Sequence, residues 1–223
     1  MRIVFKQVSK NFGFINALKD VDFKVKSGEF AFLFGPSGSG KSTVIKLILS
    51  QITPTSGQIT IGKHQLSTIS KKDIDNIRKK IGIIFQNYQL IPDRSVEENI
   101  ALSLDITSHP KDKIQAKVDE VIKKVNLTTR RLLYPSQLSG GELQRASLAR
   151  ALAINPEIIL ADEPTGNLDR QNSWNLVKLL KDINQKHHCT VLMATHDVDI
   201  VKSLDKKIIH LQNGRIVKSK KIQ

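Results

Sequence analysis

The sequence predicts an α/β fold in which a parallel sheet is joined to an inserted helical region. Short apolar strands alternate with helical segments along most of the chain, and several strands are apolar at nearly every position. Such strands are typical of a parallel sheet covered on both faces. A helical stretch over approximately residues 87–150 interrupts the alternation. We therefore expect one domain of 223 residues, with its core in 1–86 and 151–223.

The first part of the chain alternates strand-like runs with turns. The runs are RIVFKQV, VDFKV, EFAFLF and GQITI. EFAFLF is almost continuously apolar, which favours a strand buried on both faces. It leads directly into GPSGSGKST, and KSTVIKLILS has the period of a helix. The sequence thus predicts a strand, a glycine-rich loop and a helix in succession.

The middle of the chain is predicted to be helical after one more strand, IGIIF at 81–85. SVEENIALSL begins with Ser95 and Glu98 at the spacing of a capping box. DKIQAKVDEVIKKV places five apolar residues on one helical face: Ile114, Val118, Val121, Ile122 and Val125. PEIILAD and TVLMATHD predict strands that end in acidic or imidazole residues. KKIIHL and RIVK predict two last strands around the Asn-Gly turn at 213 and 214.

Composition excludes several classes of protein. Apolar residues make up 39% and charged residues 25%, and no apolar run is long enough for a membrane span or a signal peptide, so we expect a cytosolic chain. The lone Cys189 has no partner for an internal disulfide or a cysteine metal site. The net charge of +14 fits nucleic acid, an anionic membrane or a lysine-rich composition equally well. Aromatic residues, at 5%, are too few for base-stacking platforms.

The stretch GPSGSGKS at 35–42 matches the pattern G-x-x-x-x-G-K-[ST]. Its place between a predicted strand and a predicted helix is the context of a phosphate-binding loop, or P-loop. Its backbone N–H groups can surround phosphate oxygens at a helix N-terminus. Lys41 offers a charge to the β- and γ-phosphates, and Ser42 offers an oxygen to Mg²⁺. The alternative, a glycine-rich turn without a ligand, leaves this full pattern unexplained.

Polar side chains close three other predicted strands. IILADE ends in Asp162, which can direct a carboxylate at a metal ion, and Glu163, which is placed to orient or deprotonate a water molecule. Gln86 and His196 follow two further strands. Ligands of open α/β sheets bind beyond the carboxyl ends of strands, so we expect these residues near the phosphates. For each residue the alternative is a structural role as a cap or a turn former.

A second anion site is predicted at LSGGE, residues 138–142. Ser139, Gly140 and Gly141 precede a predicted helix, where a hydroxyl and unobstructed backbone amides can hold an anion. The stretch lies in the inserted region, far along the chain from the P-loop. We infer that it serves the nucleotide of another copy, in a head-to-tail homodimer with ATP between the chains.

Six motifs occur in the order in which ABC-type ATPases carry them, and the chain resembles that family over essentially its whole length. GPSGSGKST, Gln86 and LSGGE resemble the Walker A, Q-loop and signature, while IILADE, GNLD and ATHD resemble the Walker B, D-loop and H-loop. The resemblance implies a P-loop NTPase with a RecA-like parallel-sheet core, an N-terminal antiparallel β subdomain and an inserted α-helical subdomain. It also implies hydrolysis of ATP to ADP and phosphate, with ATP and Mg²⁺ bound.

The resemblance further implies roles for individual residues. The catalytic set is Glu163 as the base, His196 as the γ-phosphate sensor, Gln86 and Lys41. The metal set is Ser42, Gln86 and Asp162. The nucleotide-binding set is Phe12, Gly35, Pro36, Ser37, Gly38, Ser39, Gly40, Lys41, Ser42, Thr43, Gln86, Ser139, Gly140, Gly141, Asp169 and His196.

Two of the matched positions depart from the family pattern. Phe12 stands where the family usually has a tyrosine that stacks on adenine, and Glu142 replaces the common glutamine of the signature.

The resemblance assigns Ser139 and Gly141 to the γ-phosphate held by the partner chain. It assigns Asp169 to the connection between the two sites of the dimer.

Within the family, ADEPTGNLD is typical of ATPases that act with membrane proteins, and NYQLIPDRSVEENIAL and VLMATHD favour a cell-division role. The implied partners are a second copy on ATP binding, an integral membrane protein whose cytoplasmic helix enters a groove after Gln86, and indirectly extracytoplasmic cell-wall hydrolases. The implied location is peripheral, on the cytoplasmic side of the cell membrane.

Other functions were weighed against this one. A lipoprotein-release or efflux ATPase would keep the chemistry and change the partner. A nucleic-acid-acting member of the family is disfavoured, because the short interval between Gln86 and Ser139 leaves no room for a long coiled coil, and we expect no specific nucleic-acid partner. A nucleotide switch without turnover is disfavoured by the presence of both Glu163 and His196.

Overall fold

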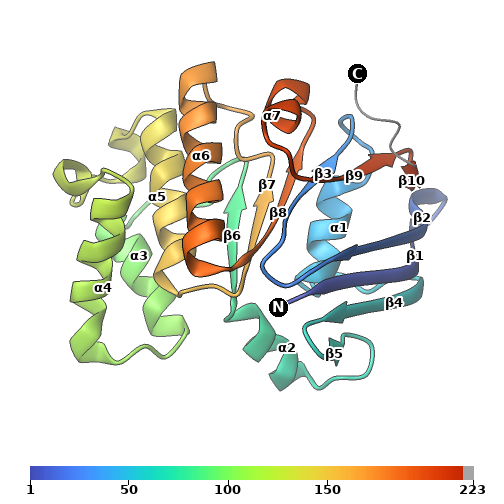
Figure 1. Cartoon of the computed structure of the whole chain (residues 1–223). Coiled ribbons are helices and arrows are strands. Elements are labelled where there is room, and N and C mark those ends of the chain that lie inside the picture. The colour runs from blue at the N-terminus through green and yellow to red at the C-terminus, as the bar shows by residue number, and fades with distance from the viewer. Residues whose placement is uncertain (218–223) are drawn as a thin grey trace.

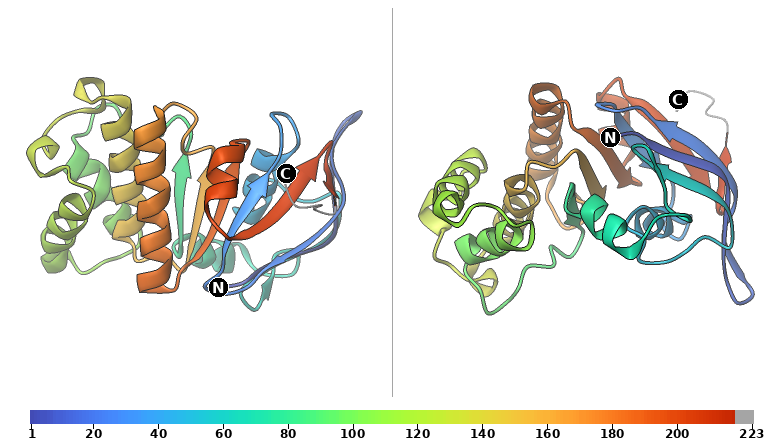
Figure 2. Two further views of the ribbon diagram at one scale, coloured as in Figure 1. Left: turned by 45° about the horizontal axis from the view of Figure 1, so that its top comes forward. Right: turned by 90° about the horizontal axis from the view of Figure 1, so that it is seen from below.

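The structure is a computed structural model and describes residues 1–217. Its strands form one antiparallel sheet and one mostly parallel sheet. The antiparallel sheet lies at one end of the molecule and helices α3 to α6 lie at the other, with the parallel strands between them (Figures 1 and 2). The predicted α/β fold with an antiparallel sheet and a helical region is confirmed.

The antiparallel sheet has the strand order β2-β1-β4-β5. Its strands are β1 (Ile3–Phe12), β2 (Ile15–Val25), β4 (Ser56–Ile61) and β5 (His64–Gln65). Ile3 and Phe5 of β1 point to the interior, because alternate residues of a strand face the same side, and an irregularity in the pairing after Phe5 buries Val8 in place of Gln7. The strands predicted from RIVFKQV, VDFKV and GQITI are present, and β1 and β2 extend further, to a hairpin tip at residues 13 and 14.

The second sheet has the strand order β10-β9-β3-β8-β7-β6 and is parallel except for β10. Its strands are β3 (Phe30–Phe34), β6 (Ile81–Phe85), β7 (Ile158–Asp162), β8 (Thr190–Thr195), β9 (Lys207–Gln212) and β10 (Arg215–Val217). β3 is buried along almost its full length, as its sequence predicts. The last predicted strand, RIVK, includes Lys218, which lies outside the described residues.

The helices of the structure are α1 (Lys41–Ile48), α2 (Lys71–Arg78), α3 (Val96–Ile106), α4 (Lys111–Lys124), α5 (Gly140–Ala153), α6 (Arg170–His187) and α7 (Val198–Ser203). The predicted capping box is present at the start of α3, where the Ser95 N–H donates to Glu98 Oε2 at 2.7 Å and the Glu98 N–H donates to Ser95 Oγ at 3.3 Å. The predicted apolar face of α4 is buried from Val118 onward, and Ile114 is half-buried at its edge.

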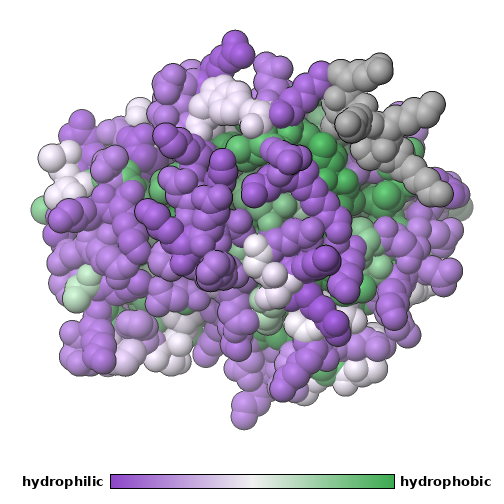
Figure 3. Space-filling model, in the orientation of Figure 1, coloured by the Kyte–Doolittle hydropathy of each residue, from purple (hydrophilic) through white to green (hydrophobic). Residues whose placement is uncertain are grey.

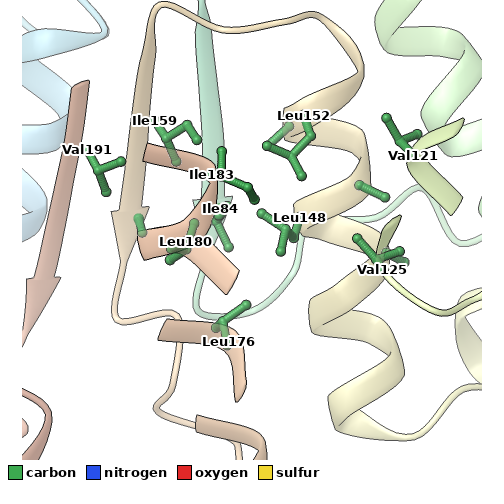
Figure 4. Close-up of a cluster of buried hydrophobic side chains, with 14 of the residues drawn as sticks. Ile84, Val121, Val125, Leu148, Leu152, Ile159, Leu176, Leu180, Ile183 and Val191 are labelled. Carbon is green, nitrogen blue, oxygen red and sulfur yellow. The ribbon is translucent and has the colours of Figure 1, made fainter. Parts of the chain in front are cut away.

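The buried apolar side chains form two clusters. One joins the antiparallel sheet to α1 and to one face of the parallel sheet, and the other joins the opposite face to α3, α4, α5 and α6. Figure 4 shows the second cluster, in which Leu148 and Leu152 of α5 lie among side chains of α4, α6, β6 and β7. The side of the molecule seen in Figure 3 is mostly hydrophilic over α4 to α6. Within residues 1–217, none of the helices combines the length and the apolar character needed to cross a membrane.

Candidate active site

The P-loop connects the central strand β3 to α1 and is held by its neighbours. The Gly35 N–H donates to Thr195 O at 3.2 Å, and a Cβ on Gly35 would lie 2.0 Å from Leu211 O. Only glycine fits this approach between the backbones of β8 and β9. Gly40, with a φ of +108°, forms the N-cap of α1. The loop therefore lies at the carboxyl ends of the parallel strands, where the sequence predicted a ligand.

The Lys41 side chain is folded back into this loop. Its Nζ donates to Gly35 O at 2.7 Å and to Pro36 O at 2.9 Å, and it lies 3.0 Å from Glu163 Oε1. The side chain is 6% exposed. A buried ammonium group needs such partners, because burial removes its hydration. The protein thus holds a cation at the position where the pattern predicts phosphate binding.

Glu163 lies between two of the other predicted catalytic residues. Its Oε1 pairs with Lys41, its Oε2 is 2.9 Å from His196 Nδ1, and its side chain is 12% exposed. Its backbone has a φ of +47°, and its N–H donates to Ala194 O at 3.0 Å. A positive φ at a residue other than glycine is uncommon and costs backbone strain, which the surrounding contacts must offset. The structure therefore brings Lys41, Glu163 and His196 together around one carboxylate.

The predicted metal residues line a common hollow of about 440 Å³, where Ser42, Gln86 and Asp162 meet. Ser42 Oγ donates to Asp162 Oδ1 at 3.2 Å. Burial raises the pKa of the Asp162 carboxyl, the nearby Glu163 charge raises it further, and the Ser42 hydrogen bond opposes both effects. Within residues 1–217, no three or more His, Cys, Asp or Glu residues lie together as a metal site. Ser42, Gln86 and Asp162 instead offer hard oxygen donors, and such donors suit Mg²⁺ when substrate phosphates supplement them.

A groove of about 580 Å³ runs along the P-loop. It is lined by the predicted Ser37, Gly38, Gly40, Lys41, Ser42, Thr43, Gln86 and Glu163 and by the unpredicted Ile15, Asn16, Ala17, Asn213 and Gly214. The Gly214 N–H donates to Ser39 O at 3.1 Å and Gly214 O accepts from the Lys19 N–H at 2.8 Å, which joins the last turn to the P-loop and β2. The sequence showed the Asn-Gly turn but gave no signal that it lines the groove.

Phe12 lies outside the lining of this groove. It pairs across the β1–β2 hairpin with Ile15, which does line it, and it is 46% exposed. Lys10 Nζ lies 5.0 Å from the centroid of the Phe12 ring, within the range of a cation–π contact. Phe12 is thus paired with a residue of the groove wall, to which Ile15 and Ala17 of β2 both contribute apolar side chains.

The signature residues start helix α5. Ser139 is its N-cap and forms a capping box with Glu142: Glu142 Oε2 accepts from the Ser139 N–H at 2.8 Å and from Ser139 Oγ at 2.7 Å. Glu142 Oε1 accepts from Arg130 Nε at 2.8 Å. The Ser139 amide and the Arg130 guanidinium together lower the pKa of Glu142 to about 2. Ser139, Gly140 and Gly141 are absent from the lining of the P-loop groove, so the structure does not bring the two predicted anion sites together within one chain.

The segment after Gln86 is tied to the signature helix by residues that sequence reasoning missed. Arg150 of α5 donates to Gln89 O at 2.5 Å and to Tyr88 O at 3.1 Å, and Ser147 Oγ also donates to Tyr88 O, at 3.2 Å. Burial lowers the pKa of Arg150. Tyr88 and Gln89 both have positive φ values. The contacts join residues about sixty positions apart, so no local pattern could have indicated them.

The predicted D-loop residue Asp169 is the N-cap of α6. Its Oδ1 accepts from the Asn172 N–H at 2.8 Å, and Asn172 Nδ2 donates to its Oδ2 at 2.5 Å. These hydrogen bonds lower the pKa of the exposed Asp169 carboxyl. Nearby, Asn167 Nδ2 donates to Gln86 O at 3.0 Å, which joins the D-loop to the Q-loop.

The comparisons with known proteins agree with this geometry. A family model described as ABC transporter matches residues 18–166. The chain is 43% identical to the cell division ATP-binding protein FtsE of Bacillus subtilis (strain 168), over 92% of this chain and 89% of that protein. It is 41% identical to the methionine import ATP-binding protein MetN 2 of Enterococcus faecalis, over 100% of this chain but 64% of that protein.

Solved structures of similar chains give the same assignment. A dimeric ATP-binding cassette in a post-hydrolysis state, bound to ADP and Pi, is 36% identical, with a TM-score of 0.89 over 99% of both chains. A dimeric bacterial ABC transporter cassette is also 36% identical, with a TM-score of 0.90 over 99% of both chains. The chain belongs to the ABC transporter family, and it is an ATPase that binds and hydrolyses ATP.

Proposed function

We propose that Glu163 is the general base of ATP hydrolysis, and the carboxylate held between Lys41 and His196 is the observation that carries this proposal. An incoming phosphate competes with Glu163 for the Lys41 ammonium. Once Lys41 turns to the phosphate, Glu163 Oε1 is free to accept a proton from water, while His196 keeps the carboxylate oriented through Oε2. The nucleotide occupies the P-loop groove, where Ser37, Gly38, Ser42 and Thr43 surround its phosphates.

Mg²⁺ belongs to the same proposal. Ser42, Asp162 and Gln86 would hold it, and it would neutralise charge on the phosphates. Ser39 Oγ is buried and has no hydrogen-bond partner within residues 1–217, which suits a P-loop that completes its bonding with a phosphate.

The substitution Glu163→Gln tests the base. It keeps the size of the side chain and removes its basicity, so we expect turnover to fall by about 100-fold or more while ATP still binds. ATP turnover and ATP binding are to be measured on the same preparation. Lys41→Ala is the companion variant, and it is expected to lose binding as well. Normal turnover by the Glu163→Gln protein would falsify the assignment of the base.

We further propose that two chains enclose two ATP molecules head to tail. Ser139 and Gly141 lie at a helix start that can hold an anion, but the P-loop groove of the same chain does not include them. A second copy supplies these residues if the partner's signature faces the P-loop. The dimeric arrangement of the two similar cassette structures supports this proposal.

For the cellular role, we propose a cell-division ATPase of the FtsE type that acts with a membrane protein of the FtsX type and, through it, with cell-wall hydrolases outside the membrane. The similarity to FtsE proteins over most of their length supports this role. The chain would then sit on the cytoplasmic face of the membrane.

A groove of about 360 Å³ beside strand β6 offers the docking site for such a partner. Ile83, Phe85 and Ile91 line it together with Leu102 and Ile106 of α3. β6 is the edge strand of the parallel sheet. An apolar groove of this kind accepts the apolar face of a partner helix. Arg150 and Gln89 also line it, so a helix bound there would contact the segment that follows Gln86.

A methionine-import role of the MetN type is the second candidate, because MetN 2 is almost as similar over the whole of this chain. An ATPase of a lipoprotein-release or efflux system, of the LolD or MacB type, would use the same catalytic residues. These roles differ in the membrane protein that binds the ATPase, and the partner therefore decides between them.

The partner is to be identified by purifying tagged Glu163→Gln protein from its own cells in mild detergent with ATP. Lys41→Ala, treated identically, is the matched control for association that depends on ATP. A four-span membrane protein with a large external domain supports the FtsE assignment. A methionine permease, or a lipoprotein-release or efflux permease, moves the chain to that branch. Nucleic acid or ribosomes without a membrane protein would overturn all of these roles.

A further inference from the structure

A second large cavity lies outside the P-loop groove. It has a volume of about 560 Å³ and lies between the end of α4, the first half of α5 and the middle of α6. It shares no residue with the lining of the P-loop groove. Its volume falls within the range of roughly 300–1,000 Å³ that is usual for small-molecule sites. Figure 1 shows these three helices on the side of the molecule away from the antiparallel sheet.

One wall of this cavity is apolar and rigid. Val125 and Leu176 line it and also belong to the buried cluster that Figure 4 shows, together with Leu148 and Leu180. Close packing of that cluster fixes the positions of α4, α5 and α6 relative to one another. The cavity is therefore a feature of the packed helices.

Gln144 of α5 lines the cavity and is 1% exposed. Within residues 1–217, neither its Nε2 nor its Oε1 has a hydrogen-bond partner, and neither does Arg145 Nε. Buried amide groups are nearly always hydrogen-bonded in native proteins, because an unpaired one loses its bonds to water without replacement. The side chain can both donate and accept, so it suits a ligand with hydrogen-bonding groups of its own.

The charged groups that line the cavity are mainly cationic. They are Lys124, Arg145, Lys178 and a single carboxylate, Asp182. Lys124 is already paired with Glu120 at 2.6 Å. Arg145 and Lys178 therefore supply the main positive charge, and a guanidinium offers forked N–H donors that match a phosphate or a carboxylate.

We propose that this cavity is a binding site for a small organic anion. Arg145 and Lys178 hold its phosphate or carboxylate group, Gln144 bonds to its polar body, and Val125 and Leu176 contact its apolar part. Gly141 and Asn172 also line the cavity. Any effect of the ligand on turnover through Gly141 rests on the proposed role of the signature, whereas binding itself does not.

The test uses the full chain saturated with ADP and Mg²⁺, so that the P-loop is occupied. Phenyl phosphate and phenyllactate are the probes, one for each anion class and each with an apolar ring, and binding is followed by titration calorimetry. Trp174 of α6, the one tryptophan of the sequence, provides a fluorescence signal next to Asn175 of the lining. We expect saturable binding of one probe, and the probe that binds identifies the class of anion.

Three variants locate the binding. Lys178→Glu and Gln144→Leu are expected to weaken it by at least tenfold. Lys186→Glu, a charge reversal at an exposed residue of the same helix that does not line the cavity, is expected to leave it unchanged. Lys178 is exposed, so its variant keeps the test valid if Gln144→Leu fails to fold. Absence of saturable binding by both probes, equal loss in Lys186→Glu, or a crystal structure grown with the binding probe that shows only water at Gln144 would overturn the proposal.

Discussion

At the scale of single residues, Glu142 shows how one side chain combines helix capping with charge. Its carboxylate accepts hydrogen bonds from the Ser139 N–H and hydroxyl, and its other oxygen accepts from Arg130. The proposed partner phosphate would need that same Ser139 hydroxyl. Arg130 neutralises Glu142, so an anion approaching Ser139 meets less repulsion than an isolated carboxylate would cause.

The substitution Glu142→Gln tests this charge through its pH dependence. The pKa of Glu142 in the folded protein is about 2, below its ordinary value of 4.5. The ionised carboxylate therefore stabilises the fold above pH 4.5, and this stabilisation is lost as the pH falls towards 2. We expect the wild type to exceed the variant by about 0.5–1 kcal/mol in free energy of unfolding at pH 7, through the ion pair and the helix dipole.

Urea unfolding at several pH values between 7 and 3 measures this difference. The gap between wild type and Glu142→Gln is expected to narrow as the pH falls below 4.5. A gap of constant size over the whole range would show that the charge of Glu142 does not stabilise the helix start.

At the scale of elements, α5 carries the signature at its start and Arg150 near its end. These positions are about 16 Å apart along the helix axis, because each residue adds about 1.5 Å. Arg150 is bonded to the carbonyls of Tyr88 and Gln89, just after Gln86. We therefore expect a shift of that segment to move α5, and Ser139 with it.

The substitution Arg150→Ala removes this connection. We expect ATP turnover to fall about tenfold while ATP affinity changes little, since coupling through such contacts is worth about 0.5–2 kcal/mol. Turnover and equilibrium ATP binding are to be measured in parallel. Arg78→Ala is the matched control, because Arg78 also donates to two backbone carbonyls, those of Leu49 and Ser50, away from α5. An equal loss of turnover in both variants would contradict the proposed connection.

Local patterns predicted most of the strands and helices α1, α3, α4 and α5, but not α2, α6 or α7. They also placed most of the candidate site. Strand ends and a glycine-rich loop were enough to assign Lys41, Asp162, Glu163 and His196 to one edge of the sheet. The groove wall formed by residues 15–17 and Gly214 was not predicted, because it depends on how the antiparallel hairpin and the last turn meet the P-loop. The partners of Arg150 were missed for the same reason, since they come from the packing of distant segments.

At the scale of the whole molecule, the two predicted anion sites belong to different parts of the chain. The P-loop lies at the carboxyl ends of the parallel strands, and the signature starts a helix of the helical region. No residue of the P-loop lines the cavity beside Gly141, and the signature residues do not line the P-loop groove. A complete site in our proposal therefore takes its P-loop from one chain and its signature from another, which makes the chemistry a property of the dimer.

Mixing two inactive variants tests whether the site is shared between chains. Lys41→Ala disables the P-loop half, and Ser139→Arg blocks the signature half at an exposed position that accommodates the larger side chain. Each variant alone is expected to be inactive. An equal mixture should recover about a quarter of wild-type turnover, because half of the dimers are mixed and each mixed dimer has one complete site.

The control is a mixture of Lys41→Ala with Asp162→Asn, two variants that both damage the P-loop half. Its mixed dimers have no complete site, so turnover should stay at the background level. Recovery in the first mixture and not in the second follows only if the P-loop and the signature act across two chains. If both mixtures stay inactive while a wild-type chain remains active at dilutions at which it is monomeric, each chain completes its own site and the head-to-tail arrangement is wrong.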